Sequence, residues 1–278
     1  MVSKELGTFF DNIRKHILDE SSDDTAVSLR ETAFSSVRND PGLQQLVPYF
    51  INFISEKVTH CLNDIFVLRQ MMYLAEAVTN NKSIFADPYM TILVPAVLTC
   101  MMGRKFGPDG ADNLKEQYAL RDLAASLIGH LTNKYGMSNQ EMRSRVIRSC
   151  LKYFLDPNRS IAEQYGAING IRTGGGPEGV SQLVLPNLKI YETILVKVQH
   201  ERGENDEQYR MLLGAIVKAV QCITGDDEIF MTNGMNGKAA AQGAMVEEYL
   251  GTVIGSRIAV LNNHRLNEAI LATREREE

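Results

Sequence analysis

The sequence contains no tryptophan and only four cysteines among its 278 residues. The cysteines, Cys61, Cys100, Cys150 and Cys222, lie far apart, and each falls within a helical pattern. Zinc sites and redox motifs need closely spaced cysteines, so both kinds of site are excluded. We expect the four thiols to be small core residues of a protein in a reducing compartment.

Long apolar runs are also missing. None approaches the ~20 residues that a helix needs to cross a bilayer, and the chain does not open with the basic and apolar regions of a signal peptide. We therefore expect no membrane partner and a soluble protein of the cytoplasm or nucleus.

Positively charged residues are fewer than negatively charged ones. The chain has 29 lysines and arginines against 34 aspartates and glutamates, a net charge of −5 at pH 7. A protein whose whole surface binds nucleic acid needs a large positive excess to displace counterions. That class is excluded, while a local basic patch remains open.

Motifs for catalysis are lacking too. The five histidines are isolated, and no serine lies in a G-x-S-x-G turn. Residues 174–179 satisfy G-x-G-x-x-G, but no strand precedes them, so we interpret them as an interhelix linker. The single acidic cluster at residues 226–228 cannot clamp several magnesium ions alone and favours a helix N-terminus. We predict no catalytic residue, no cofactor, no metal site and no small-molecule substrate.

The sequence does contain a pattern of amphipathic helices. It is clearest in residues 84–136, which predict one helical hairpin. Asp87 is expected to cap the first helix and Pro88 to be its first residue. Pro95 lies inside that helix and is expected to bend it, and Gly103 to end it. The second helix carries an apolar stripe at i, i+3, i+4 spacing from Leu120 to Leu131.

An internal repeat accompanies the hairpin pattern. Residues 40–48 and 87–95 share Asp-Pro, Leu-Val-Pro and the gap between their prolines, at an offset of 47 residues, and residues 183–186 repeat the Leu-Val-x-Pro element in part. A period of ~40 to 47 residues made of two helices is typical of HEAT and armadillo arrays.

The predicted fold is therefore all-α, an α-solenoid of about five HEAT-type helical hairpins. We expect residues 1–39 to form N-terminal helices that pack on the array, residues 40–225 to form the HEAT repeats, and residues 226–278 to form C-terminal capping helices. Residues 172–179 are expected to be a linker and residues 232–243 a loop, with one or two helices in residues 245–272.

One polar feature favours an interaction surface. Arg143, Arg145, Arg148 and Lys152 lie on one predicted helix, and the last three fall within about 60° of each other around its axis. The apolar residues of that helix lie on its other side. A solvated face or salt bridges to a neighbouring repeat would explain the stripe, and so would contact with an acidic partner or a phosphate backbone. Arg121-Asp122 is interpreted as part of a polar ladder between repeats.

Several segments carry a resemblance to a known family. They are Asn39–Leu43, FINFISEK at residues 50–57, LVPAVLTC at 93–100, ALRDLAA at 119–125, RSRV at 143–146, QYGAING at 164–170 and VLPNL at 184–188. In this order they resemble the C-terminal HEAT-repeat domain of the TFIID subunit 6 family of TBP-associated factors, over about residues 4–191. The histone-like fold with which members of that family begin is not found here, so we expect a fragment or a reduced form.

The resemblance implies a nuclear, non-enzymatic scaffold of the general transcription factor TFIID, and often of the related SAGA coactivator, with other subunits of these complexes as partners. It leaves direct DNA contact open and identifies no binding residue. The alternatives are another HEAT-type scaffold, of the transport or phosphatase class, and a helical enzyme.

Overall fold

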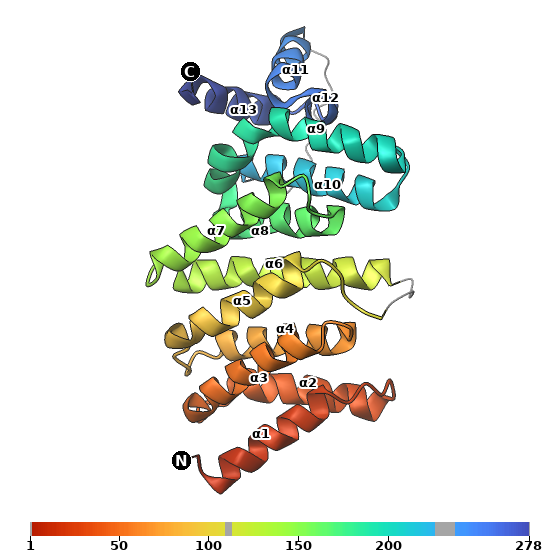
Figure 1. The fold of residues 1–278 in the computed structure, drawn as a ribbon. Helices are drawn as coiled ribbons and strands as arrows, with labels where there is room; N and C mark the ends of the chain where they lie inside the picture. The colour runs from red at the N-terminus through yellow and green to blue at the C-terminus, as the bar shows by residue number, and fades with distance from the viewer. Residues whose placement is uncertain (1, 109–112, 226–236, 278) are drawn as a thin grey trace. The chain divides into compact units, whose positions relative to one another are not determined.

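The computed structural model describes residues 2–108, 113–225 and 237–277. All the regular elements in these ranges are helical (Figure 1), which confirms the all-α class. The chain divides into two compact units, residues 1–142 and 143–278. The boundaries at residues 39 and 225 that the sequence suggested remain predictions.

The first unit consists of helical pairs joined by short turns. Its described helices are α1 (Lys4–Ile17), α2 (Asp24–Asn39), α3 (Val47–His60), α4 (Ile65–Asn80), α5 (Met90–Met102) and α6 (Leu114–Tyr135). Each odd-numbered helix packs against the even-numbered helix that follows it, while α4 also packs on α2 and α6, and α3 on α5. This two-layer stacking is the HEAT-type arrangement that the sequence predicted.

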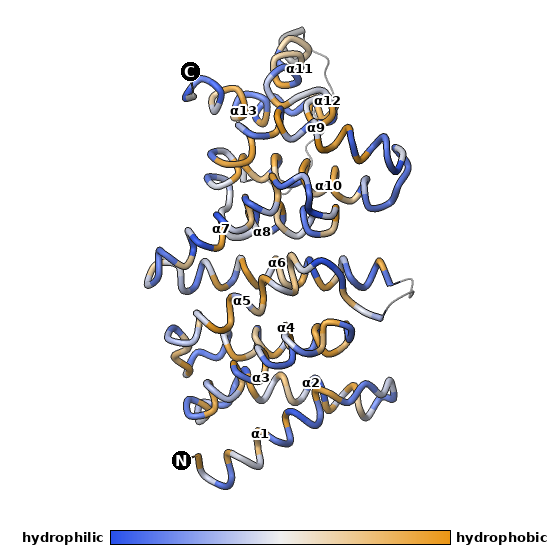
Figure 2. The backbone as a smooth tube through the Cα atoms, viewed as in Figure 1, coloured by the Kyte–Doolittle hydropathy of each residue, from blue (hydrophilic) through white to orange (hydrophobic). Residues whose placement is uncertain are grey.

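The helix starts in this unit follow from local chemistry. Asp23 caps α2 by accepting a hydrogen bond from the Ala26 N–H (2.9 Å), and Asp64 caps α4 through the Val67 N–H (3.1 Å). Figure 2 shows apolar and polar residues interspersed along these helices, the amphipathic pattern that lets each helix bury one side.

The internal repeat is real, but its predicted register was wrong. The 3₁₀ turn Gln44–Leu46 precedes α3, and the 3₁₀ turn Asp87–Tyr89 precedes α5, an offset of 43 residues. The buried side chains of α3 recur as buried side chains of α5 at the same offset. The pairs are Val47 and Met90, Phe50 and Leu93, Ile51 and Val94, Phe53 and Ala96, Ile54 and Val97, and Val58 and Met101. The two Leu-Val-Pro segments are therefore not structurally equivalent.

The start of α5 also differs from the prediction. Asp87 does not cap the helix, because it lies in the 3₁₀ turn and its carboxylate accepts a hydrogen bond from the Ser138 hydroxyl (2.8 Å). Pro95 lies inside α5 as predicted, and Gly103 follows the helix as its C-cap. The bend expected at Pro95 remains a prediction.

Hydrogen bonds connect successive turns of the first unit. The side-chain amide of Gln44 pairs with both backbone groups of Phe85, donating to its carbonyl (3.1 Å) and accepting from its N–H (2.7 Å). The Asn81 amide donates to the carbonyl oxygens of Val37 and Asp40, each at 2.8 Å. These bonds fix the turn before α5 to the turn before α3.

In the second unit, a kinked helix replaces the predicted linker. The described helices of the second unit are residues 143–155 of α7 (Gln140–Leu155), α8 (Ile161–Gly179), a π-helical turn (Val180–Val184), α9 (Leu185–Arg202), α10 (Glu207–Gln221), α11 (Gly237–Leu250), α12 (Thr252–Val260) and α13 (His264–Glu277). The chain remains helical through Gly175 and breaks at Gly176, whose φ of 63° and ψ of −163° favour glycine. The linker expected at residues 172–179 was therefore wrong, since these residues are helical apart from the break at Gly176.

The C-terminal helices begin earlier than predicted. Residues 237–243, expected to be loop, belong to α11, and α12 and α13 follow it; residues 226–228 and 232–236 lie outside the described residues. Helix α12 has Gly251 at its N-cap, with no capping side chain of its own. The Glu192 carboxylate of α9 accepts a hydrogen bond from the Val253 N–H (2.7 Å) and so caps α12 from a neighbouring helix.

Two of the four cysteines predicted to be core residues are buried: Cys100 and Cys150 are 0% exposed. The prediction was wrong for the other two, since Cys61, at the end of α3, and Cys222 are half-buried. Burial raises the pKa of the Cys100 thiol to about 12, against the charge of Arg121, and burial likewise raises the pKa of Cys150 to about 12. Since the thiolate is the reactive form, both buried thiols are expected to be inert.

Thiol labelling checks this expectation. With maleimide at pH 8, half-buried Cys61 should react first. Cys100 and Cys150 should react on the order of a thousandfold more slowly than a free thiol, because the raised pKa makes their thiolate fraction that much smaller. Peptide mass spectrometry after a time course measures the rates, and the chain unfolded in urea serves as the control in which all cysteines react. Prompt labelling of Cys100 or Cys150 in the folded chain would contradict the assignment.

Candidate interaction surface

The predicted basic stripe lies on the exposed side of α7. Arg143, Arg145, Arg148 and Lys152 are all exposed, and Val146, Cys150 and Phe154 on the opposite side are buried. The sequence therefore placed both faces of this helix correctly. Whether the stripe binds anything remains a prediction.

Burial of Phe154 holds the helix in place. Its ring stacks on Tyr191 of α9, with the ring centres 4.1 Å apart and the planes 22° apart. The Tyr191 hydroxyl donates to Gln164 of α8 (2.6 Å), whose amide donates in turn to the Asp156 carbonyl (3.0 Å). This buried network ties α7, α8 and α9 together and so presents the stripe on a rigid element.

The four basic residues have different surroundings. Arg143 Nη2 donates to the carbonyl oxygen of Gly175 (3.4 Å), directly before the kink of α8, so Arg143 also supports the fold. Within the described part of the chain, neither Arg148 nor Lys152 has a carboxylate within 4.0 Å. Arg145, Arg148 and Lys152 are the residues best placed to meet a partner.

Among the described residues, the acids of the turn after α7 pair with another arginine rather than with Arg148 or Lys152. Arg159 lies 3.1 Å from the Glu163 carboxylate and 3.4 Å from that of Asp156, and its guanidinium lies 3.8 Å from the centre of the Tyr153 ring. This cluster occupies the turn between α7 and α8. The charge of Arg148 and Lys152 is thus left for solvent or a partner.

Arg121 is a core residue rather than part of a ladder between repeats. Its side chain is 0% exposed, and its Nη1 donates to the carbonyl of Met101 (3.1 Å) at the end of α5. The guanidinium lies 4.7 Å from the centre of the Phe106 ring. The bond lies within the hairpin of α5 and α6, so the predicted ladder role was wrong.

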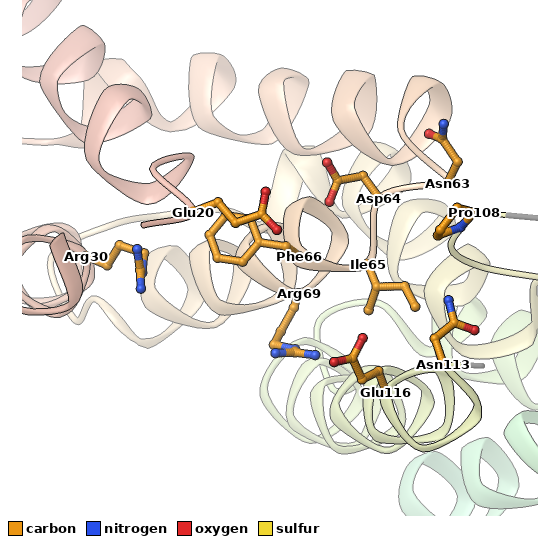
Figure 3. A pocket seen from close by; sticks show the side chains of 10 residues that line it. All are labelled: Glu20, Arg30, Asn63, Asp64, Ile65, Phe66, Arg69, Pro108, Asn113 and Glu116. Atoms are coloured by element: carbon orange, nitrogen blue, oxygen red, sulfur yellow. The ribbon is translucent and has the colours of Figure 1, made fainter. Parts of the chain in front are cut away.

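The first unit also contains a hollow of about 730 Å³ near the start of α4 (Figure 3). It is lined by Glu20, Arg30, Asn63, Asp64, Ile65, Phe66, Arg69, Pro108, Asn113 and Glu116. Arg30 makes contacts within the fold, since its guanidinium lies 5.5 Å from the centre of the Phe66 ring and its Nη1 donates to the Ser21 carbonyl (2.9 Å). Charges of both signs line the hollow, so it favours no single class of ligand.

Within the described ranges, no group of three or more histidine, cysteine, aspartate or glutamate side chains could hold a metal ion. Of the helices that the structure describes, none combines the length and apolar character needed to cross a membrane.

Comparison with known proteins identifies the family. The TAF6 C-terminal HEAT repeat domain matches residues 1–189, which is most of the chain. The chain belongs to this family. The matched part includes α7 and the basic stripe, and the helices from α10 onward lie beyond it.

Similar proteins extend the match. The "SAGA complex/transcription factor TFIID complex subunit Taf6" of Schizosaccharomyces pombe is 38% identical over 268 residues, which are 96% of this chain and 57% of that protein. "Transcription initiation factor TFIID subunit 6" of Arabidopsis thaliana is 34% identical over 83% of this chain and 41% of its own length. The chain thus spans about half the length of these curated relatives.

A solved structure supports the α-solenoid fold. The TAF6 C-terminal domain from Antonospora locustae matches with a TM-score of 0.60 and 25% identity, over 78% of this chain and 97% of that one.

The capping box that starts α8 was not predicted, although Ser-x-x-Glu is its sequence signal. The Ser160 hydroxyl accepts from the Glu163 N–H (3.3 Å), and the Glu163 carboxylate accepts from the Ser160 N–H (2.8 Å). Burial raises the pKa of Glu163, but the hydrogen bonds from Ser160 and Arg159 outweigh it and hold that pKa below its usual value of 4.5. A lowered carboxyl pKa stabilises the fold above the unfolded pKa, and the benefit is lost as the pH falls through the folded pKa.

Replacing Glu163 with glutamine should therefore lower the free energy of unfolding at pH 7 by about 1 to 2 kcal/mol. The difference from wild type should shrink as the pH is lowered from 7 to below the folded pKa of Glu163, because the wild-type carboxyl becomes neutral as well. Urea unfolding at a series of pH values measures this difference in the free energy of unfolding. Glu275→Gln, at an exposed position in the same unit, is the control and should change little. A deficit independent of pH would count against the ionised box.

Proposed function

We propose that this chain is a non-enzymatic scaffold of the general transcription factor TFIID, and of the SAGA coactivator, that works in the nucleus by binding other subunits. The observation that carries the proposal is the 38% identity, over 96% of the chain, to a protein named as a subunit of both complexes. Family membership over residues 1–189 supports it.

The fold suits this role for a physical reason. HEAT-type hairpins bury their apolar stripes against neighbouring hairpins and leave the outer side of each helix exposed. Such surfaces bind proteins through side-chain contacts and need no cofactor. The relatives named above are subunits of TFIID or of both TFIID and SAGA, and their names favour this role over a transport or phosphatase scaffold or a helical enzyme.

We propose further that Arg145, Arg148 and Lys152 contact an acidic surface of a partner subunit. All three are exposed, and the acids of the adjoining turn are already paired with Arg159. Exposed charges at the rim of an interface mainly affect the association rate and its salt dependence. The stripe is therefore expected to steer and orient a partner rather than to supply most of the affinity.

Co-purification tests the scaffold proposal. The tagged chain, expressed in cells of its source organism, should retain TFIID subunits, and SAGA subunits as well, after purification from nuclear extract. Mass spectrometry of the retained proteins gives the result. Recovery of a transport complex or a phosphatase in place of these subunits would refute the proposal.

Charge reversal tests the stripe. The double variant Arg145→Glu/Arg148→Glu should weaken subunit binding on the order of tenfold at low salt, and the deficit should shrink as salt screens the charges. Thermal stability should stay nearly the same, because both side chains are exposed. Binding constants at several salt concentrations and a melting curve provide the measurements.

The matched control is Lys82→Glu/Lys115→Glu, which changes the net charge equally at exposed positions of the first unit. It should bind as the wild type does. A loss of binding equal to that of the stripe variant would show that net charge alone matters. A stripe variant that binds normally would remove Arg145 and Arg148 from the interface, and a selective loss of DNA binding would reassign them to nucleic acid.

A further inference from the structure

A second exposed surface lies on α10, beyond the part of the chain that the family match covers. Arg210, Gly214 and Lys218 follow one another at i, i+4 and i+8, and all three are exposed. Glycine is among the least favourable residues inside a helix. A Cβ built on Gly214 meets nothing within 4 Å, so packing inside the described chain gives no reason for the glycine.

Other glycines show what a packing reason looks like. A Cβ on Gly255 would lie 2.4 Å from the Glu247 Cα, so the close approach of α11 and α12 requires glycine there. Gly7 of α1 is as open as Gly214, so an open glycine alone does not mark a site. What distinguishes Gly214 is the groove around it.

The groove has a volume of about 430 Å³ and lies between the turn before α10, α10 itself and α12, which packs against α10. Its lining consists of Glu204, Asn205, Arg210, Leu213, Gly214, Val217 and Arg257. Gly214 leaves the helix backbone accessible, and the half-buried Val217 beside it supplies apolar surface, whereas Leu213 is buried in the core. We call this feature the Arg210–Arg257 groove.

Two arginines and one glutamate, Glu204, are the charged residues that line the groove, so its described lining carries a net positive charge. Arg210 has no carboxylate within 4.0 Å among the described residues, and Arg257 donates only to the Val253 carbonyl of its own helix (2.6 Å). The acids nearby have other partners. Glu204 accepts from the Gln199 amide (2.5 Å), Asp206 pairs with Arg202 (3.5 Å), and Glu192 caps α12 through the Val253 N–H (2.7 Å).

We propose that the Arg210–Arg257 groove binds a segment of a partner protein in which an acidic residue adjoins an apolar one. The carboxylate accepts hydrogen bonds from Arg210 and Arg257, which are suited to bidentate pairing. The apolar side chain covers Val217, and the partner's main chain comes close to the helix over Gly214, where no side chain blocks it.

The chemistry favours a peptide over nucleic acid. A phosphate backbone would contact the two arginines but would leave the half-buried Val217 uncovered, whereas an acidic and apolar segment satisfies both features. This surface is separate from the α7 stripe, and the proposal does not depend on the identity of the complex to which the chain belongs.

Peptide selection followed by measured binding tests the proposal. Random peptides displayed on phage are selected on the full chain, and the best peptides are synthesised with a fluorophore for anisotropy titration. Peptides with aspartate or glutamate next to leucine, isoleucine or phenylalanine should be enriched. They should bind Arg210→Gln/Arg257→Gln on the order of tenfold more weakly. Oligothymidylate should not displace them.

A second variant guards against failure through misfolding. Gly214→Leu fills the open space with a residue that favours helix, so it should leave the melting temperature unchanged or higher while weakening the selected peptides by a similar factor. Gly7→Leu, at the other open glycine, is the matched control and should bind as the wild type does. Selected peptides without acidic residues, or equal binding by wild type and both groove variants, would overturn the proposal, as would displacement by oligothymidylate.

Discussion

Burial of apolar side chains between neighbouring helices is the constraint on which the first unit depends. Every buried side chain of α3 has a buried counterpart 43 residues later in α5, even though the residues themselves differ, as Phe53 and Ala96 do. A hairpin of two amphipathic helices cannot bury both of its apolar sides by itself, so each pair needs the next one. The repeat therefore lies in the pattern of burial rather than in residue identity.

Polar bonds between turns set the spacing that this burial requires. Gln44 holds both backbone groups of Phe85, and Asn81 satisfies two carbonyl groups near the end of α2. These are the inter-repeat polar contacts that sequence analysis had assigned to Arg121. Arg121 is instead buried inside one hairpin, where it satisfies a carbonyl at the end of α5. The sequence does not show whether an arginine on an apolar stripe bonds between repeats or inside one hairpin, because both roles need a cation beside a helix end.

Much of the fold could be predicted because amphipathic spacing is a local property. The faces of α7 follow from 100° per residue alone, and the structure placed Val146 inside and Arg148 outside as expected. The register of the repeat could not be predicted in the same way. A shift of four residues is about one helical turn, so an apolar stripe fits an offset of 43 nearly as well as one of 47. The matching prolines favoured 47, and the apolar pattern gave no reason to reject it.

Other misses came from contacts between segments distant in sequence. The glycines and proline of residues 172–179 indicate a linker when propensity alone is considered. The helix nonetheless continues through Gly175, which packs near Ile147 of α7 and whose carbonyl accepts from Arg143. Tertiary contacts thus override local preference. The same limit applies to the Arg210–Arg257 groove, since nothing in the sequence shows that Arg257 lies beside α10.

The distribution of charge explains how an acidic chain can attract acidic partners. The chain carries a net charge of −5, so at long range it repels another acidic protein weakly. At physiological salt, exposed charges are screened beyond about 8 Å, and local clusters therefore determine which surfaces associate. Acids beside the α7 stripe and beside the groove pair with Arg159, Arg202, Gln199 or a helix N-terminus. Because Arg159 pairs with the carboxylates of the adjoining turn, Arg148 and Lys152 have no carboxylate within 4.0 Å among the described residues, and the groove lining holds two arginines against one glutamate. These local excesses of positive charge lie on packed helices, and they select a partner by position rather than by net charge.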